Sequence, residues 1–277
     1  MALVVTEKVR PNVTVIRLNR PERLNAMSFE LITALCDACA EVGADNGCWV
    51  VILTGEGRGF CSGLDLEDPG VIPGIDEMAL SRVGMLAMSH FSKVVPALRA
   101  MPQPVIAAIN GCAYGGGLCL SLAADLRFCA ESAVFNAAGI VNGLTSTELG
   151  ASYLLPRIVG LSRSNDMLLT GRKVNAREAE RMGLVSRIYP DEEVLDRAVE
   201  AAETMCEFSA FGLQMTKSVC WANVEATSLT AAIDLEDRNQ LILGNTENLV
   251  ECITARKEKR KPVYTDLPRT DLGTDSA

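Results

Sequence analysis

A run of three glycines separates an apolar strand-like segment from an apolar helix-like segment. Residues 104–109 form the first segment, residues 115–117 are the glycines, and residues 118–124 form the second segment. Glycine allows close backbone approach, and the first amides of a helix have no partners within the helix. Such a helix N-terminus favours negative charge. The run therefore predicts backbone amides that bind a phosphate or the oxyanion of a reacting carbonyl.

Strand-like and helix-like segments alternate over the first two thirds of the chain. Strands are expected at residues 4–8, 13–18, 49–54, 104–109, 126–129 and 183–188, and helices at 28–42, 76–100 and 118–124. This alternation predicts an α/β fold. Helical signals dominate from about residue 195. We therefore expect a core domain over 1–195, a helical region over 196–262 and a loose tail over 263–277.

The composition argues against several classes of protein. The 277 residues carry a net charge of −9, which disfavours nucleic acid as a partner. The ten cysteines are scattered through expected helices and strands, so we expect reduced thiols. The chain opens on a strand-like run and not on a secretory signal, so we expect a cytoplasmic location. No apolar run is long enough to span a membrane, so no membrane partner is expected. Cys36 and Cys39 form a lone CxxC in a helical pattern, which favours packing over a metal site.

Histidine is nearly absent from the chain. His90 is the only one, and it lies in an expected helix with no GxSxG motif nearby. A Ser-His-Asp hydrolase is therefore difficult to build from these residues. We expect proton transfer to depend on a carboxylate instead.

A second glycine-containing loop follows the expected strand at 49–54. Gly63 lies in this loop, and its freedom from side-chain constraints would allow the amide of Leu64 to face a cleft. An ordinary strand-to-helix turn is the alternative interpretation. Two loops that each offer one amide could together hold the oxygen of one carbonyl, which would stabilise an enolate.

Several motifs occur in a fixed order along the chain. They are LNRPERLNAM at 18–27, FCSGLDL at 60–66, NGCAYGGG at 110–117, LTGR at 169–172, AREA at 176–179 and GLV at 183–185. Together they resemble the enoyl-CoA hydratase/isomerase (crotonase) superfamily over residues 3–262. The resemblance implies a crotonase-like spiral of ββα units with a C-terminal helical region. It also implies trimers or dimers of trimers, in which residues 196–262 contribute to trimerisation.

The same resemblance implies a site for an acyl-CoA thioester as the substrate, with no separate cofactor and no metal. It places the two oxyanion amides on Leu64 and Gly116. It places coenzyme A contacts near Arg23, Leu24, Ala26, Ser62, Asp65 and Leu66. The basic run at 256–261 could bind coenzyme A phosphates or be a solvated helix face. The expected helix at 76–100 would line an acyl pocket with Met78, Met85, Leu86, Met88 and Phe91, or these side chains could be core.

Two positions depart from the pattern of the family's hydratases, which use two glutamates. Cys119 and Gly139 stand at these positions in this chain. Glu148 lies close to the place where some family isomerases carry an aspartate. Its alternative role is structural, because Thr145 and Glu148 have the spacing of a capping box, in which the carboxylate would bind the Thr145 amide. Cys119 could act as a weak acid or as a nucleophile, although its apolar helix position favours inert packing.

A single acid/base beside an oxyanion hole suits the movement of a double bond better than the efficient addition of water. We therefore predict an enzyme of the enoyl-CoA hydratase/isomerase type in fatty acyl-CoA metabolism, with Glu148 as the acid/base and isomerisation favoured. The missing glutamates leave two alternatives open. One is a non-catalytic acyl-CoA binder, and the other is a CoA-thioester hydrolase or lyase that uses the same oxyanion hole.

Overall fold

The computed structural model describes residues 2–71, 75 and 78–267. Within this part of the chain, six strands form a sheet in the order β1-β2-β3-β5-β7-β10. The β1–β2 pair is an antiparallel hairpin, and the other neighbours in the sheet are parallel. The strands are β1 (Val4–Arg10), β2 (Val13–Leu18), β3 (Val50–Gly55), β5 (Val105–Ile109), β7 (Leu126–Ala130) and β10 (Arg187–Tyr189).

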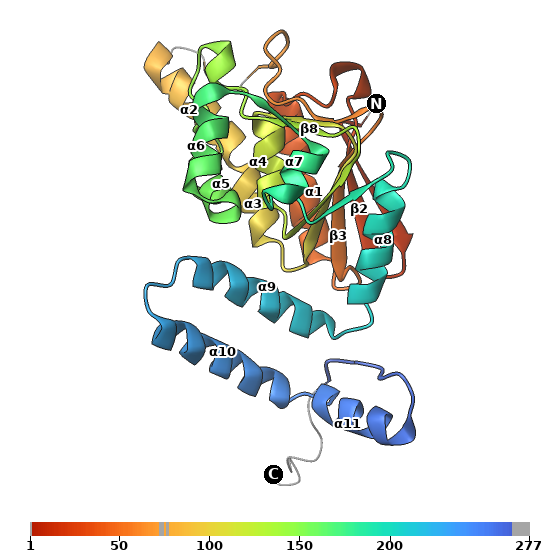
Figure 1. The fold of residues 1–277 in the computed structure, drawn as a ribbon. Helices are drawn as coiled ribbons and strands as arrows, with labels where there is room; N and C mark the ends of the chain where they lie inside the picture. The colour runs from red at the N-terminus through yellow and green to blue at the C-terminus, as the bar shows by residue number, and fades with distance from the viewer. Residues whose placement is uncertain (1, 72–74, 76–77, 268–277) are drawn as a thin grey trace.

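A second sheet consists of short strands in the order β4-β6-β8-β9 among the described residues. These are β4 (Gly59–Cys61), β6 (Cys112–Tyr114), β8 (Val134–Asn136) and β9 (Lys173–Asn175). Each of β3, β5 and β7 in the first sheet is followed by one short strand in the second sheet and then by a helix (Figure 1). This repeat is the ββα spiral that the resemblance implies, so the predicted fold class is confirmed.

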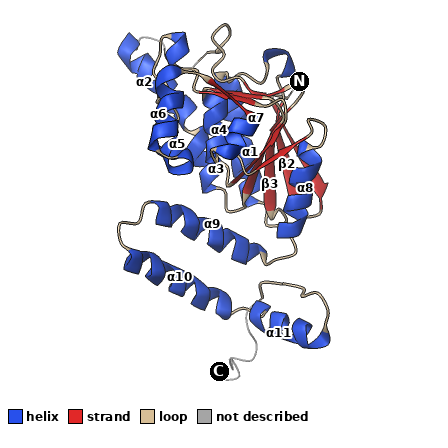
Figure 2. Cartoon of the chain, in the orientation of Figure 1, coloured by secondary structure: helices blue, strands red, loops and turns tan. Residues whose placement is uncertain are grey.

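The helices of the core pack against the first sheet and against one another (Figure 2). Helix α1 contacts β1 and β2, α8 contacts β3 and β5, and α4 contacts α3 and α5. Two short 3₁₀ helices, η1 (Pro21–Arg23) and η2 (Ile140–Asn142), lie in loops. The α-helices of this part are α1 (Phe29–Ala44), α2 (Leu80–Ser92), α3 (Val94–Ala100), α4 (Gly116–Ala123), α5 (Ala151–Val159), α6 (Leu161–Thr170), α7 (Ala176–Arg181) and α8 (Val194–Met205).

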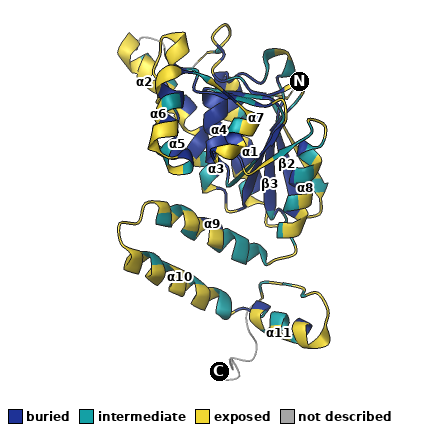
Figure 3. Cartoon of the chain, in the orientation of Figure 1, coloured by how far each residue is buried: buried dark blue, intermediate teal, exposed yellow. Residues whose placement is uncertain are grey.

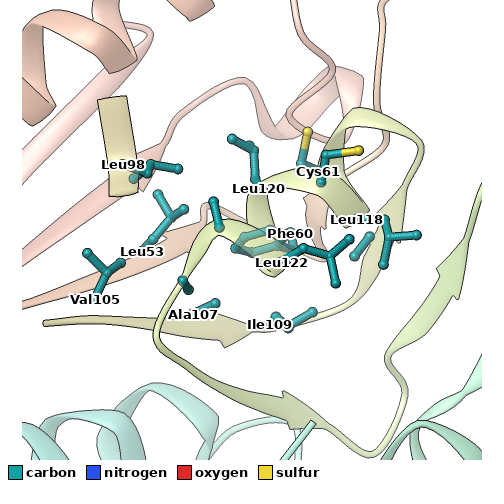
Figure 4. Packing of buried hydrophobic residues seen from close by; sticks show 14 of the residues in the cluster. Leu53, Phe60, Cys61, Leu98, Val105, Ala107, Ile109, Leu118, Leu120 and Leu122 are labelled. Atoms are coloured by element: carbon teal, nitrogen blue, oxygen red, sulfur yellow. The ribbon is translucent and has the colours of Figure 1, made fainter. Parts of the chain in front are cut away.

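The core itself is apolar and closely packed. Leu53, Phe60, Leu118 and Ile109 are among its fully buried side chains, and they come from both sheets and from α4 (Figure 4). Residue Cys61 is also buried there, and burial raises the pKa of its thiol to about 12. Packing therefore fixes the strand ends from which the two glycine loops begin.

The expected helix at 76–100 is wrong as a single element, because it divides into α2 and α3 at Lys93. Pro96 explains the division. It has no amide to donate to the preceding turn, so it is tolerated only in the first turn of a new helix, where α3 places it. Residue 76, where the expected helix begins, lies outside the described residues.

Two further expectations require correction. Strand β6 lies within the segment that we interpreted as a loop, since Cys112–Tyr114 pairs with β4 and β8. The expected strand at 183–188 is limited to β10, which begins at Arg187 and pairs with β7. Ser28 caps α1 at the start of the expected helix over 28–42, with its Oγ accepting from the Leu31 amide at 3.2 Å.

Three C-terminal helices extend away from the core as a separate layer (Figure 1). They are α9 (Ala210–Val224), α10 (Leu229–Gly244) and α11 (Asn248–Glu258). Lys217 on α9 connects this layer to the core, because its Nζ lies 3.1 Å from Asp125 Oδ2 and donates to the Gln103 carbonyl at 2.9 Å. Trp221 also donates to Asp125. Asp125 therefore has a structural role, since it joins α9 to the core.

Most of the α10 surface is exposed, and none of its residues is buried (Figure 3). The described part of the expected tail, 263–267, is held against this layer by Asp266. Its carboxylate accepts from the Phe211 amide at 3.1 Å and from Asn248. The remaining residues, 268–277, lie outside the described part of the chain.

Candidate active site

One cavity brings together the residues that the two glycine loops were expected to contribute. Its volume is about 550 Å³. Leu64, Gly116 and Glu148 all line it. The other lining residues are Met27, Met88, Phe91, Gly143, Leu144, Thr145, Thr147 and Leu149. The two predicted amide positions therefore open onto one shared hollow.

The loop after β4 presents the Leu64 amide to this cavity. Met27 donates to the Gly63 carbonyl at 2.7 Å, and Asp65 donates to the Met27 carbonyl at 3.0 Å. In a parallel bridge of this kind, the amide of the central residue points away from the partner strand. The Leu64 N–H is therefore directed away from Met27, as an oxyanion donor requires.

Glycine is necessary at the points where the two loops touch. Gly63 has a φ of +91°, and a Cβ there would lie 2.7 Å from the Tyr114 carbonyl oxygen and 3.3 Å from the Gly116 nitrogen. A Cβ at Gly117 would lie 2.0 Å from the Cys61 carbonyl oxygen. Side chains at these positions would separate the loops. The close approach of the two backbones depends on this absence of side chains.

Gly116 is the first residue of α4, so its amide has no partner within that helix. The helix dipole adds positive potential at this end, although α4 has only eight residues. The Gly116 and Leu64 amides together form a candidate pair of donors for one carbonyl oxygen.

The Glu148 carboxyl group faces the glycine run. Its Oε1 lies 3.1 Å from the position that a Cβ on Gly115 would occupy. Burial raises the pKa of Glu148 above its usual value. Glu148 is the only carboxylic acid among the described residues that line the cavity. A partly desolvated carboxyl that shares a cavity with Leu64 and Gly116 is suited to proton transfer next to a polarised carbonyl.

The capping box expected at Thr145 and Glu148 is wrong. The helix that follows, α5, begins at Ala151, three residues beyond Glu148, and its N-cap is Gly150. Leu149 and Gly150 both have positive φ, at 47° and 86°. These two residues turn the chain before the helix starts, so Thr145 is too far from the first helical turn to cap it.

Cys119 is a buried packing residue, as its apolar surroundings suggested. Its side chain is 1% exposed, and burial raises its thiol pKa well above the usual value. The Sγ donates to the Glu148 carbonyl at 3.5 Å. The thiol therefore supports the backbone of the residue that carries the candidate base.

Gly139 has no room for any side chain. A Cβ there would lie 2.0 Å from the Thr145 carbonyl oxygen and 3.1 Å from the Ser146 Cα. Ser146 holds this arrangement by accepting from the Ile140 amide at 3.0 Å and donating to the Ala137 carbonyl at 2.8 Å. The space next to Gly139 is thus filled by the chain that leads to Glu148.

The expected coenzyme A contacts form one strip along the loop after β2 and the loop after β4. Ser62 donates from its amide to the Leu24 carbonyl at 3.0 Å, and Ala26 donates to the Arg23 carbonyl. Leu66 is 62% exposed. The structure brings these residues together next to Leu64. Their contact with coenzyme A stays a prediction.

Two charged residues in this strip already have partners. Asp65 is 3% exposed and accepts two hydrogen bonds from Arg23, at 2.6 and 3.2 Å, and further ones from the amides of Glu67 and Asp68. Arg20 also lies 3.2 Å from Asp65. These contacts hold the pKa of Asp65 well below its usual value. Asp65 therefore holds the loop after β4 to the loop after β2 through its contacts with Arg23 and Arg20, whether or not a ligand is bound.

The expected acyl-pocket residues divide into two groups. Met88 and Phe91 line the cavity, whereas Met78, Met85 and Leu86 do not. His90, on the same helix, contacts the Thr33 hydroxyl at 3.2 Å and the Phe29 carbonyl at 3.0 Å. His90 therefore has hydrogen-bond partners on α1 and does not line the cavity.

The basic run at 256–261 lies at the end of α11. Arg260 pairs with Glu251 and Glu258, and Lys261 pairs with Glu207. These pairs are typical of a solvated helix surface. Binding of coenzyme A phosphates by this run stays a prediction.

Sequence reasoning did not identify Met27 and Leu149 as cavity residues. Met27 lies in the opening motif, and its bridge to Leu64 is the contact that such a motif could have signalled. Leu149 had no signal, because a leucine with positive φ cannot be recognised from its residue type.

Among the described residues, no cluster of histidine, cysteine, aspartate and glutamate could hold a metal ion. The same residues include no helix with the length and hydrophobicity needed to cross a membrane.

The comparisons with known proteins agree with this geometry. The model of the family "Enoyl-CoA hydratase/isomerase" matches residues 8–267. "Probable enoyl-CoA hydratase EchA12" of Mycobacterium tuberculosis is 48% identical over 267 residues, which are 96% of this chain and 94% of that protein. The "1,2-epoxyphenylacetyl-CoA isomerase" of Escherichia coli is 33% identical, over 94% of this chain and 98% of that protein.

Solved structures give the same result. A probable enoyl-CoA hydratase/isomerase from Mycobacterium abscessus superposes with a TM-score of 0.92 at 43% identity, over 97% of this chain and all of that one. A monofunctional enoyl CoA isomerase from M. smegmatis superposes with a TM-score of 0.71 at 44% identity, over 84% of this chain and 99% of that one. With the family match over nearly its whole length, the chain belongs to the enoyl-CoA hydratase/isomerase family.

Proposed function

We propose that this protein is an enoyl-CoA isomerase that moves the double bond of an acyl-CoA thioester from position 3 to position 2. The observation that carries the proposal is the placement of Glu148. Its carboxyl faces the glycine run, and it is the only acid among the described lining residues of a cavity that also contains Leu64 and Gly116.

In the proposed reaction, the thioester oxygen accepts hydrogen bonds from the Leu64 and Gly116 amides. Glu148 removes a proton from carbon 2, and the electron pair of that C–H bond moves into the enolate, whose charge rests on the held oxygen. The same carboxyl then returns the proton to carbon 4, and the double bond comes to lie between carbons 2 and 3. Loss of one such amide donor typically costs about 2.7–4 kcal/mol of transition-state stabilisation.

The raised pKa of Glu148 supports its role as the base. Burial makes the carboxylate a stronger base than one in water, and it brings the pKa closer to neutral pH. A general base in this position typically contributes 10²–10⁴-fold to the rate.

Hydration is disfavoured in this proposal because it commonly needs a second group, one to activate water and one to protonate carbon. The positions of the family's two glutamates are Cys119 and Gly139 here. The first is a buried thiol and the second has no room for a side chain. One of the solved relatives, at 44% identity, is described as a monofunctional enoyl CoA isomerase, which agrees with the proposal.

The test measures turnover of a 3-enoyl-CoA and of a 2-enoyl-CoA by the wild-type protein and by Glu148→Gln. We expect the wild-type protein to convert the 3-enoyl ester and to hydrate the 2-enoyl ester poorly. Glu148→Gln should lower kcat by about 10²–10⁴-fold. The matched control is Glu192→Gln, since Glu192 is exposed and lies outside the cavity.

The outcomes separate the alternatives. Unchanged turnover in Glu148→Gln would end the role of Glu148 as the base. Tight binding of both esters with conversion of neither would favour a non-catalytic acyl-CoA binder. Release of free coenzyme A would favour a thioester hydrolase, and a shortened acyl chain would favour a carbon–carbon lyase.

We also propose that the chain forms homotrimers, or dimers of trimers, through its C-terminal layer, and that it works in the cytoplasm on fatty acyl-CoA esters. The exposed apolar side chains of this layer support the first part. They include Leu229, Ile233, Leu241, Ile242 and Ile253. Other copies of the chain would cover apolar side chains that are exposed in this layer. Light scattering that gives the mass of one chain would refute the trimer.

A further inference from the structure

Few charged side chains of this protein are buried, and the proposed mechanism uses none of them. Of the charged residues that the structure describes, Arg20, Asp65 and Lys217 are the buried ones, with 8%, 3% and 7% exposed. Lys217 connects α9 to the core, whereas Arg20 lies close to the Leu64 loop without lining the cavity. Burial of a charge is costly unless the charge is paired, so the contacts of Arg20 indicate what the fold gains from it.

The Arg20 guanidinium connects two loops. Its Nη1 donates to the Ala26 carbonyl at 2.8 Å in the loop after β2, and its Nη2 lies 3.2 Å from Asp65 Oδ2 in the loop after β4. Arg23 also binds Asp65, but its other guanidinium partner is the Glu67 carboxylate. Arg20 is therefore the arginine that joins the carboxylate of one loop to the main chain of the other.

Both partners of Arg20 are direct neighbours of the bridge that orients the candidate oxyanion amide. Ala26 precedes Met27 and Asp65 follows Leu64, and Met27 and Leu64 are the two residues of the bridge. The two main-chain hydrogen bonds of this bridge measure 2.7 and 3.0 Å and lie on either side of Leu64. The guanidinium thus holds the same two segments together one residue away. Since the bridge directs the Leu64 N–H, this contact helps to fix the direction of that N–H.

Further hydrogen bonds fix both ends of the connection. The Arg20 amide donates to Asn25 Oδ1 at 2.8 Å, and Asn25 Nδ2 donates to the Gly59 carbonyl at 2.7 Å. The Asp65 carboxylate accepts from two amides of its own loop, at 3.1 and 3.0 Å. Neither side chain can turn freely, so a change at Arg20 reaches the main chain at Leu64.

We propose that Arg20 is a positioning residue for the reaction: through Ala26 and Asp65, it holds the Leu64 amide in the direction that a hydrogen bond to the thioester oxygen requires. This inference rests on the proposed function, in which that amide binds the oxygen. Arginine suits the task because its planar guanidinium carries several donors in a fixed arrangement, and so it can bind a carbonyl and a carboxylate at once.

Arg20→Lys is the first test, because it keeps the charge and removes the second arm. A single ammonium group is a compact charge that cannot reproduce the planar fork of the guanidinium. We expect kcat/KM for a 3-enoyl-CoA to fall by about 10- to 100-fold, since a misplacement of about 1 Å can cost about 100-fold in rate. Calorimetric titration with free coenzyme A, which has no acyl carbonyl, should change by less than about threefold in affinity, because separate sites respond independently.

The second readout is the infrared band of the bound carbonyl, which a merely structural role of Arg20 would leave in place. The ligand is butanoyl-CoA with ¹³C at its carbonyl carbon, a saturated ester that cannot undergo double-bond movement. Hydrogen bonds to a carbonyl oxygen weaken the C=O bond and lower its stretching frequency. We expect the band on the wild-type protein to lie below that of the free ester in water, and on Arg20→Lys to return at least halfway.

Asp65→Asn tests the other end of the connection with a side chain of the same shape. It removes the charge that Arg20 pairs with, so we expect the carbonyl band to shift in the same direction as in Arg20→Lys. If Arg20→Lys does not fold, this variant decides the question. An unshifted band in Asp65→Asn would then overturn the inference.

Arg127→Lys is the matched control. The Arg127 guanidinium also donates to two main-chain carbonyls, those of Leu184 at 2.7 Å and Ala124 at 2.8 Å, and Arg127 does not line the cavity. We expect both arginine variants to unfold at lower urea concentration than the wild-type protein. Only Arg20→Lys should lower kcat/KM and shift the carbonyl band.

An unchanged kcat/KM or an unchanged band in Arg20→Lys would overturn the inference. Equal losses in Arg127→Lys would do the same, and so would a loss of coenzyme A affinity as large as the loss of rate, since both indicate general damage to the fold. A wild-type band at the frequency of the free ester would overturn the inference and the proposed function together. A lowered wild-type band that Arg20→Lys reverses, without isomerisation of a 3-enoyl ester, would leave the inference intact and refute only the proposed function.

Discussion

Gly139→Ala tests the packing that positions Glu148. The new Cβ would lie 2.0 Å from the Thr145 carbonyl oxygen, whereas ordinary contacts begin at 3.4 Å, so the backbone at 145–146 must move by about 1.4 Å. Overpacking typically costs about 1–3 kcal/mol. We expect a loss of about 3 kcal/mol in the free energy of unfolding, because the obstacle is main chain that hydrogen bonds of Ser146 hold in place.

The same displacement should reach Glu148, three residues beyond Thr145. A misplacement of about 1 Å can cost about 100-fold in rate, so we expect a comparable loss in kcat/KM for a 3-enoyl-CoA. Urea unfolding measures the first effect, and steady-state kinetics measure the second. Gly244→Ala is the control, since a Cβ there meets nothing within 4 Å and the residue ends α10.

Wild-type stability and activity in Gly139→Ala would refute this reasoning, because the 145–148 segment would then not depend on contact with Gly139. The double variant Cys119→Glu, Gly139→Glu extends the test. We expect it to destabilise the protein further and to gain no hydratase activity. Efficient hydration of a 2-enoyl-CoA by this variant would show that the two carboxylates fit this backbone after all.

Three further predictions follow from buried ionisable groups. Burial raises the pKa of Glu148 above the ordinary value of 4.5, so kcat/KM should fall as the pH decreases and the carboxylate becomes protonated. The midpoint of this fall should lie above pH 4.5. A kcat/KM that stays constant down to pH 4.5 would contradict the role of Glu148 as the base. Lys217→Met should lower the free energy of unfolding by about 3–5 kcal/mol, because the largely buried Asp125 carboxylate would lose its cationic partner. Urea unfolding measures this change. An unchanged midpoint of the urea transition would contradict the prediction. Iodoacetamide at neutral pH should label the exposed Cys220 and leave Cys119 unlabelled, because burial raises the pKa of the Cys119 thiol. Mass spectrometry locates the label, and an activity assay should show that activity is retained. Inactivation together with a label on Cys119 would refute this prediction.

The α/β fold class and the close approach of the two glycine loops could be predicted because local chemistry specifies them. Gly63 and Gly117 lie where any Cβ would strike backbone, so their residue type alone marks the close approach. Ser28 caps α1 through its own side chain, and that signal also lies in the local sequence. The strands β3 and β5 are continuous buried runs, which is what parallel strands covered on both faces require.

The surroundings of Glu148 could not be predicted, because nonlocal contacts determine them. The Thr145–Glu148 spacing favoured a capping box, but the helix begins only at Ala151. Thr145 packs against Gly139, and Leu149 has a positive φ, so the residues before Ala151 are not helical. Neither feature can be recognised from the residues next to Glu148. In the same way, the division between α2 and α3 follows from Pro96, which we read as part of one helical pattern.

Cys119 and Gly139, where the resemblance leads us to expect glutamates in a hydratase, both lie against the segment that carries Glu148. A glycine at 139 lets the Thr145 carbonyl occupy the space of one expected glutamate. The thiol at 119, where the other glutamate is expected, donates to the Glu148 carbonyl. Residues 119 and 139 thus both contact the segment that carries Glu148, whose carboxyl faces the glycine run. On the proposed function, the site works with one carboxyl, on a loop that contacts residues 119 and 139, instead of two glutamates at those residues. Conversion of this site to hydration would require the whole of segment 139–149 to be rebuilt, since either glutamate alone would displace the base that the segment positions.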